Sequence, residues 1–350
     1  MKLSAGLGLG GRRDFEQVVQ HLGEMERAGI DIITCPEAWS FDAFAQLAFI
    51  AARTERAQLM TSIVNVFSRS ATQIAASAAT VDEMSGGRFI LGVGSSGPQV
   101  VEGFWGVPFT KPLSQIVDVI GVCRMMWRRD KVVYAGKAVQ VPVPPGRGTG
   151  LGKPLNLMNY PIRQDIPIWW AAQTPKAVEM AAEIADGWLP FGFIPERADR
   201  VWAEALAAGK ARRAKDRLPW EVSTGVSVAI GENLPVQQLR DQARPGLALY
   251  LGGMGARGAN FYNDTAIKLG FADEAKEIQD LYLDGHRDQA AAKVPAEWLE
   301  KTSMIGPRSY VKERLAAYRE AGVTTLSIRA VGGQDQIATI EAMRTLVDEL

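Results

Sequence analysis

Two neighbouring segments of the chain carry small polar residues in the pattern of a cofactor site. The first is a strand-like apolar run that becomes polar toward its end, Thr61-Ser62-Ile63-Val64-Asn65-Val66-Phe67-Ser68-Arg69. A helical segment then leads through Ser85-Gly86-Gly87-Arg88 into a second apolar run, Phe89 to Val93, which is followed by Ser95 and Ser96. Parallel strands joined by a helix present their carboxyl ends at one edge of the sheet. The pattern therefore indicates one wall of a barrel-type cofactor site.

The sequence contains no motif that indicates a metal site, a serine hydrolase or a P-loop enzyme. His21 and His286 are the only histidines, and neither stands at a spacing typical of metal ligands. We expect His21 to be a solvated side chain on its helix and predict no metal site. There is no G-x-S-x-G elbow and no Walker lysine motif, so serine hydrolase and P-loop chemistry are not indicated. An organic cofactor is the better source of the chemistry.

Two glycine-rich turns admit a dinucleotide-binding fold as an alternative. Gly6 to Gly11 matches G-x-G-x-x-G after a strand, and Glu37 stands where a ribose-binding acid could be sought. Gly92 to Gly97 matches the same pattern. Two such fingerprints within one series of strand–helix units favour the tight turns of a barrel.

Strand-like and helix-like periods alternate along the whole chain. Such alternation predicts a parallel sheet of the α/β class, and eight strands match the closed (β/α)8 TIM barrel. The eight expected strands are Leu3–Leu9, Ile30–Cys35, Leu59–Val66, Phe89–Val93, Ile168–Ala172, Gly187–Phe193, Val222–Ile230 and Thr324–Ala330.

Two segments exceed the minimal strand–helix unit. Val139 to Arg163 is rich in proline and glycine and predicts a long connection before the fifth strand. Pro245 to Lys301 contains at least two helical stretches and could cover the active-site mouth. We expect one domain over residues 1–350, with a helical insertion between strands 7 and 8 at approximately 235–305.

Composition excludes some partners. Lys+Arg and Asp+Glu both number 39, and no segment gathers basic and aromatic residues along one face, so nucleic acid is not expected as a partner. The basic helix at 207–215 is expected to be a solvated face. Two distant cysteines, Cys35 and Cys123, fit a reducing cytoplasm, and no apolar run approaches the ~18 residues needed to span a membrane.

Three motifs together resemble the luciferase-like superfamily, and more narrowly its deazaflavin (coenzyme F420)-dependent oxidoreductases. They are the stretch from Thr61 to Arg69, Ser85 to Gly94, and Ala185-Asp186-Gly187-Trp188. The resemblance covers nearly the whole chain. Because flavin and deazaflavin members share the Ser-Gly-Gly-Arg motif, that motif identifies the fold better than the cofactor.

The resemblance implies a cofactor ring resting on a bulge at the end of the third strand. In relatives the bulge holds a non-prolyl cis peptide, which corresponds here to Ser62-Ile63. The other residues implied to contact the cofactor follow the fourth, fifth and sixth strands: Ser95, Ser96, Gly97, Gln173, Thr174, Lys176 and Gly192. Gln173 and Thr174 stand where relatives place small residues near the cofactor phosphate, although Lys176 could also be an ordinary exposed lysine.

Departures from the family pattern bear on the substrate. Sugar-phosphate dehydrogenases of the group have an Asp-His pair after the second strand and a Glu after the fourth, where this chain has Glu37-Ala38 and Gly97. Glu37 is our candidate proton donor, with a structural hydrogen bond to nearby backbone as the alternative. Asn65 and Gln99 could orient a polar group of the substrate. An apolar pocket wall is predicted from aromatic residues that could equally be core: Trp39, Phe67 and Trp105.

The sequence thus predicts a coenzyme F420-dependent oxidoreductase, acting as a reductase of a C=C, C=N or C=O bond in a small, hydrophobic substrate. An FMN-dependent monooxygenase of the same superfamily is the first alternative, and a non-catalytic deazaflavin-binding protein is the second. Because relatives are commonly dimers, the resemblance also implies a homodimer.

Overall fold

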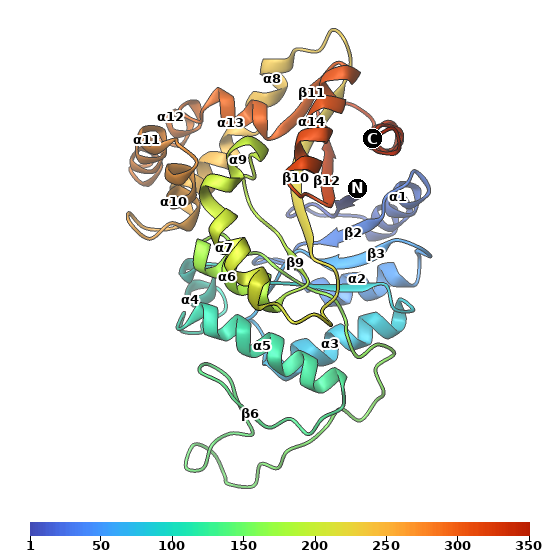
Figure 1. Ribbon diagram of the computed structural model, residues 1–350, viewed down its shortest axis with the longest axis vertical. Helices are drawn as coiled ribbons and strands as arrows, with labels where there is room; N and C mark the ends of the chain where they lie inside the picture. Colours follow the sequence, from blue (N-terminus) through green and yellow to red (C-terminus); the bar gives the residue numbers. More distant parts are fainter.

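The computed structural model describes residues 1–350 and shows eight parallel strands closed into a barrel (Figure 1). The ring closes because β10 pairs with β9 on one side and with β12 on the other. This confirms the predicted (β/α)8 TIM barrel of the α/β class. In ring order the strands are β1 (Lys2–Gly6), β2 (Ile32–Cys35), β3 (Gln58–Thr61) continued by β4 (Val64–Asn65), β5 (Phe89–Gly94), β8 (Ile168–Trp170), β9 (Gly187–Trp188), β10 (Glu221–Ile230) and β12 (Thr325–Ala330).

Several predicted strands are shorter than expected. The run Leu59–Val66 is interrupted at Ser62 and Ile63, and the run Gly187–Phe193 ends as a strand at Trp188. Gly192 has a φ of +64°, outside the range of an extended strand, so the chain turns there toward the next helix.

Helices cover the outside of the barrel. Their apolar faces and the outward side chains of the strands form one large core, which is why the strand interiors are rich in aliphatic residues. A separate, smaller cluster fills the barrel interior with Ile32, Met60, Ile90 and Trp169. The outer helices are α1 (Phe15–Arg27), α2 (Ala43–Ala51), α3 (Ala71–Met84), α5 (Pro112–Trp127), α6 (Pro175–Ile184), α7 (Ala198–Arg212), α14 (Arg308–Glu320) and α15 (Gln336–Asp348), with the short α4 (Pro98–Gly103) and the 3-10 turn η1 (Pro195–Arg197).

The Ser-Gly-Gly-Arg motif lies at the amino-terminal end of the barrel, where it joins three segments. The Arg88 guanidinium donates hydrogen bonds to the carbonyls of Ala57 at 2.7 Å, Ser85 at 2.8 Å and Thr54 at 2.9 Å. These bonds tie the turn between α3 and β5 to the loop that leads into β3. The motif therefore holds the β3–α3–β5 unit together from the end opposite to the cofactor residues.

The long connection between α5 and β8 contains only a short antiparallel hairpin, β6 (Tyr134–Ala135) with β7 (Gln140–Val141). From there to Arg163 the chain forms an extended loop that projects from the barrel at the bottom of Figure 1. None of the helices combines the length and the apolar character that crossing a bilayer requires.

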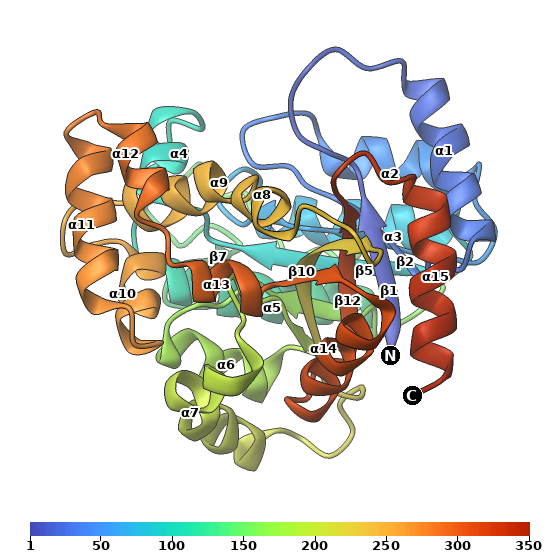
Figure 2. The ribbon, with the colours of Figure 1, turned by 90° about the horizontal axis from the view of Figure 1, so that it is seen from above.

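A helical insertion separates β10 from β12, the seventh and eighth strands of the barrel, as predicted. It also contains a strand that the sequence did not indicate, β11 (Ser303–Gly306), which pairs with the second half of β10 outside the ring. Figure 2 shows α8 and α9 at the end of the molecule where α4 lies. The insertion comprises α8 (Val236–Asp241), α9 (Arg244–Ala248), the π-helical turn η2 (Leu249–Gly253), α10 (Phe261–Lys268), α11 (Ala272–Leu283), α12 (Arg287–Ala292), α13 (Ala296–Lys301) and β11.

Candidate active site

A bulge separates β3 from β4 at the carboxyl-terminal end of the barrel, which we call the mouth. Met60 pairs with Ile90 and Val64 with Val93, so residues 61–63 stand opposite only residues 91 and 92. The Thr61 hydroxyl bridges the gap, because it accepts from the Gly92 N–H at 2.8 Å and donates to the Gly92 carbonyl at 2.9 Å. One extra residue is thus built into the third strand where the resemblance places the cofactor ring.

The peptide bond between Ser62 and Ile63 is cis, as predicted. The Ile63 side chain lies against Gly94 of the neighbouring strand. A methyl group in place of a Gly94 hydrogen would lie 2.9 Å from Ile63 Cδ1 and 3.0 Å from Cγ1, so the position requires glycine unless Ile63 moves. Gly94 therefore makes the room in which Ile63 presents its side chain at the mouth.

Asn65 follows the bulge and is buried, with 1% of its surface exposed. Its Oδ1 accepts from the Phe67 N–H at 2.9 Å, which fixes the orientation of the amide. Its Nδ2 is buried and has no hydrogen-bond partner in the protein. Since buried donors are nearly always paired, this nitrogen is suited to donate to a bound group.

The end of β5 completes this side of the mouth. Ser95 is half-buried and donates from its hydroxyl to the Ser96 carbonyl at 3.2 Å, and Ser96 has a φ of +57°. Gly97 is buried and precedes α4 as its N-cap. We call Ser62 to Asn65 together with Gly94 to Ser96 the β3–β5 wall.

The predicted residues after β8 and β9 form a second group with mainly structural contacts. The Gln173 amide accepts from the Phe191 N–H and donates to the Phe191 carbonyl, both at 3.1 Å. Thr174 caps α6 by accepting from the Ala177 N–H, and the exposed Lys176 pairs with Glu179 at 3.2 Å. The space in front of Gly192 is filled by the Trp298 ring, which a methyl group there would approach to 2.5 Å. Close packing of Trp298 therefore accounts for this glycine.

Glu37 lies at the end of β2 with none of its surface exposed. Its two carboxylate oxygens accept from the Arg69 guanidinium at 2.8 and 2.7 Å, and Oε2 also accepts from the Ala43 N–H at 3.2 Å. Arg69 bonds Asp42 as well. Burial alone would lower the pKa of Arg69, but the hydrogen bonds from its guanidinium to Glu37 and Asp42 raise it above its usual range. The bond to Ala43 matches the structural alternative, and delivery of a proton by Glu37 stays a prediction.

The aromatic and amide residues predicted for the substrate pocket lie in different surroundings. Phe67 is buried and packs on Phe109 with 5.3 Å between ring centroids. Trp105 is half-buried and its Nε1 has no partner, whereas Gln99 is exposed. Trp39 is 54% exposed, so it is not a core residue.

Trp39 belongs to a set of exposed large apolar side chains on the loops after β1, β2 and β5. These loops lie at the same end of the molecule in Figure 2. Exposed apolar groups at the opening of a site are typical of a surface that binds an apolar ligand. The set consists of Leu9, Trp39, Phe41 and Phe104.

The sequence did not single out several residues of the mouth. No local spacing marks Arg69 as a site residue, because its ion pair with Glu37 spans 32 positions. Phe191, Tyr250 and Tyr262 were also missed. Phe191 follows β9, whereas the two tyrosines belong to the helical insertion, and their rings meet only in the folded chain.

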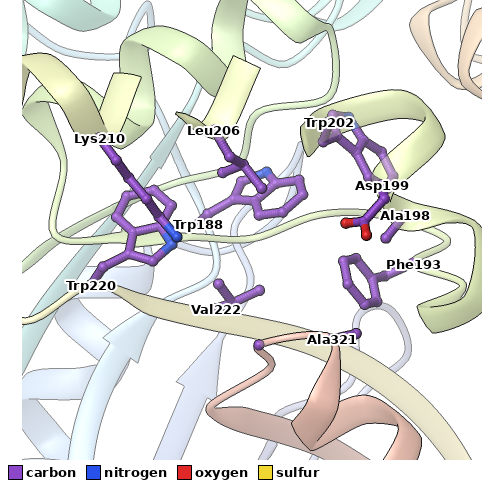
Figure 3. Close-up of a pocket in the computed structure, with 11 residues that line it drawn as sticks. Trp188, Phe193, Ala198, Asp199, Trp202, Leu206, Lys210, Trp220, Val222 and Ala321 are labelled. Atoms are coloured by element: carbon purple, nitrogen blue, oxygen red, sulfur yellow. The ribbon is translucent and has the colours of Figure 1, made fainter. Parts of the chain in front are cut away.

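Figure 3 shows a crevice between α7 and the strands β9 and β10. Trp188, Trp202 and Trp220 line it, together with Val222 near the start of β10 and Gly322 just before β12. Its volume is about 60 Å³. Most of its lining residues belong to the core between the strands and the outer helices, whereas active sites of TIM barrels lie at the carboxyl-terminal ends of the strands.

Comparison with known proteins assigns the family. The model of the luciferase-like monooxygenase family matches residues 2–325. A Mycobacterium tuberculosis protein, whose name assigns it to the coenzyme F420-dependent oxidoreductases, is 36% identical over 347 residues, covering 98% of this chain and 99% of the relative.

Solved structures agree on the fold. The coenzyme F420-dependent tetrahydromethanopterin reductase of Methanopyrus kandleri aligns with a TM-score of 0.75 at 21% identity, covering 98% of this chain and 97% of that one. The oxygenating constituent of 3,6-diketocamphane monooxygenase of Pseudomonas putida, in complex with FMN, aligns with a TM-score of 0.63 at 14% identity, covering 98% and 96%. This chain is an enzyme that belongs to the luciferase-like monooxygenase family.

Proposed function

We propose that the enzyme is a coenzyme F420-dependent reductase of a C=C, C=N or C=O bond in a small, hydrophobic substrate. The observation that carries the proposal is the unpartnered Asn65 Nδ2, buried beside the contact between Ile63 and Gly94. The relative with 36% identity supports the deazaflavin over a flavin.

The β3–β5 wall fits a flat heterocycle. Ile63 offers an apolar surface to a ring face, and Asn65 Nδ2 offers a donor to an acceptor atom on the ring edge. When bound, the reduced deazaflavin supplies a hydride. Ser62, Ile63 and Asn65 would hold the ring, together with Ser95, Ser96 and Gly97. Gln173, Thr174 and Lys176 would line the path of the cofactor tail, whereas Trp298 fills the space in front of Gly192.

The direction of the reaction rests on what this chain lacks. Ala38 and Gly97 stand where the sugar-phosphate dehydrogenases of the group have the histidine and the glutamate. Without a histidine base, removal of a proton from an alcohol has no evident acceptor, so reduction is favoured. The exposed apolar side chains Leu9, Trp39, Phe41 and Phe104 at the mouth support a hydrophobic substrate.

An FMN-dependent monooxygenase is the second candidate, because the wall offers the same apolar surface and donor to a flavin. One FMN-binding structure of this fold aligns over nearly the whole chain. Parallel titrations with coenzyme F420 and FMN decide between the two. We expect saturable binding of F420, and we expect the reduced cofactor to be reoxidised when an enone, imine or aldehyde is added, which is seen as a rise in the absorbance of oxidised F420. Tight retention of FMN without F420 binding would refute the proposal.

We also propose that the enzyme works in the reducing cytoplasm and as a homodimer. Cys35 and Cys123 are both buried free thiols, which supports a reducing compartment. The dimer is suggested by the resemblance alone. Light scattering on the purified protein tests it, and a monomer at micromolar concentration would contradict it.

A further inference from the structure

Three aromatic rings from separate segments meet beside the mouth. Phe191 follows β9, Tyr250 lies in the π-helical turn η2, and Tyr262 lies in the first turn of α10. The rings of Phe191 and Tyr250 are stacked with centroids 4.2 Å apart, and the Tyr262 ring meets them edge-on at 5.0 and 4.9 Å. These contacts fix where the two tyrosine rings lie.

The segment that carries Tyr250 is held rigidly, although it is not a regular α-helix. The Asn260 amide donates to the carbonyls of Tyr250 and Leu251, both at 3.0 Å. The Asn263 amide donates to the Leu251 carbonyl at 2.9 Å and to the Ala275 carbonyl at 2.7 Å. Two buried asparagines thus replace the missing helical partners of this turn. Single π-helical turns of this kind are frequent at functional sites.

Contacts at both ends place this segment next to the mouth. At one end Tyr250 stacks on Phe191, which Gln173 ties to the end of β8. At the other end a methyl group on Gly97, after β5, would lie 3.9 Å from the Met254 carbonyl oxygen. Residues 249–255, which we call the strap, therefore run from the end of β9 to the end of β5.

The hydroxyl groups of Tyr250 and Tyr262 have no protein partners, because no hydrogen bond in the structure involves either one. Neither hydroxyl oxygen is fully buried, so a small ligand or water can reach both. Burial raises the pKa of Tyr250, and burial with the nearby Tyr250 raises that of Tyr262. Both side chains are therefore neutral phenols that can donate hydrogen bonds but are weak acids.

We propose that the hydroxyl groups of Tyr250 and Tyr262 bind the carbonyl oxygen of the substrate at the mouth. The inference rests on the proposed reductase function, for which such an oxygen is part of an enone, ketone or aldehyde. The tyrosines act as substrate-binding residues and do not supply the proton. A phosphate or carboxylate oxygen of the cofactor has the same acceptor chemistry, and the experiment separates the two sources.

The test compares two probes that differ by one oxygen, cyclohexenone and cyclohexene. Dissociation constants of both are measured by calorimetry on the enzyme saturated with coenzyme F420, for the wild type, Tyr250→Phe, Tyr262→Phe and the double variant. Each single variant should bind cyclohexenone about fivefold more weakly, the effect of one neutral hydrogen bond. Binding of cyclohexene and of F420 should not change. Tyr160→Phe, an exposed ring on the projecting loop, is the matched control and should change nothing.

Three results would overturn the proposal. Equal weakening for both probes would show that the rings only pack against the ligand. Weaker F420 binding with an unchanged ratio of the two probes would place the acceptor on the cofactor. Unchanged dissociation constants for all ligands and all variants would show that the two hydroxyl groups contact only water. If the wild type binds FMN instead of F420, the probe pair is measured on that complex, so the cofactor assignment can fail separately.

Discussion

Three glycines of the barrel strands differ in how much room each leaves for a methyl group, and alanine substitutions at these positions test the β3–β5 wall. An alanine methyl at Gly225 in β10 would have its nearest neighbour, the Ser327 carbonyl oxygen, at 3.9 Å. At Gly94 it would meet the end of the Ile63 side chain at 2.9 Å. At Gly92 it would lie 1.8 Å from the Thr61 carbonyl oxygen, which belongs to the backbone of the bulge.

The three contacts predict three different costs in the free energy of unfolding. Gly225→Ala should change stability by less than about 1 kcal/mol, because the methyl has room. Gly94→Ala should cost about 1–3 kcal/mol, since Ile63 can rotate away but loses its packing. Gly92→Ala should cost more than about 4 kcal/mol, because Thr61 cannot move away without breaking the hydrogen bonds between its hydroxyl and the Gly92 backbone.

Cofactor binding adds the decisive measurement. Urea unfolding gives the stability of each variant, and titration with coenzyme F420 gives its dissociation constant. Gly94→Ala should remain folded and lose affinity at least tenfold, since Ile63 must leave the surface on which the ring is proposed to rest. Gly225→Ala should bind as the wild type does. A folded Gly94→Ala variant with unchanged affinity would refute the placement of the ring against Ile63.

Three further predictions concern buried ionisable groups. Glu37→Gln removes one charge of the buried ion pair with Arg69 and should lower the free energy of unfolding in urea by about 2 kcal/mol. Asp42→Asn should lower it less, because Asp42 is the exposed partner of Arg69. An unchanged urea midpoint for Glu37→Gln would contradict this prediction. Burial raises the pKa of Glu26, but the N–H groups of Ala57, Arg56 and Glu55 outweigh it and lower that pKa, so the stability that Glu26 contributes is present above about pH 4.5 and lost below it. Acid titration of unfolding should therefore show Glu26→Gln less stable at pH 7 and the difference closing below pH 4.5; a constant difference would argue against it. Burial raises the pKa of the Cys35 and Cys123 thiols to about 12, so iodoacetamide at pH 8 should modify neither by mass spectrometry until urea is added.

Much of the fold could be predicted from the sequence, because strand and helix periods are local signals. All eight barrel strands coincide with apolar runs in the chain, and the insertion falls between the seventh and eighth. Strand ends were less predictable. Trp188 ends β9 five residues before the apolar run ends at Phe193, since turns and side-chain packing decide where pairing stops.

Two residues of the motifs that carry the resemblance, Arg88 and Asp186, make structural contacts at the end of the barrel opposite to the mouth. Arg88 binds carbonyls of neighbouring segments, and Asp186 accepts from the Ile168 N–H at 3.0 Å and from Arg124 at 3.1 Å. These contacts explain why such motifs report the fold. The Ser62-Ile63 cis bond was found through the same resemblance, whereas the pairing of Tyr250 with Phe191 depends on distant segments that no spacing rule connects.

The extra residue in the third strand also reverses which side chains face inward. Met60 points into the barrel with Ile90, and in an unbroken strand the even-numbered residues after it would do the same. After the bulge Val64 and Val66 instead join the outer core, while Ile63 lies over Gly94 on the inner side. The alternation has been inverted, so that Asn65 shares the inner side with Ile63. A deletion of one of residues 61–63 would restore an unbroken ladder and leave Asn65 opposite Gly94 on the inner side. The strand would keep its donor but lose the bulge that lays Ile63 over Gly94.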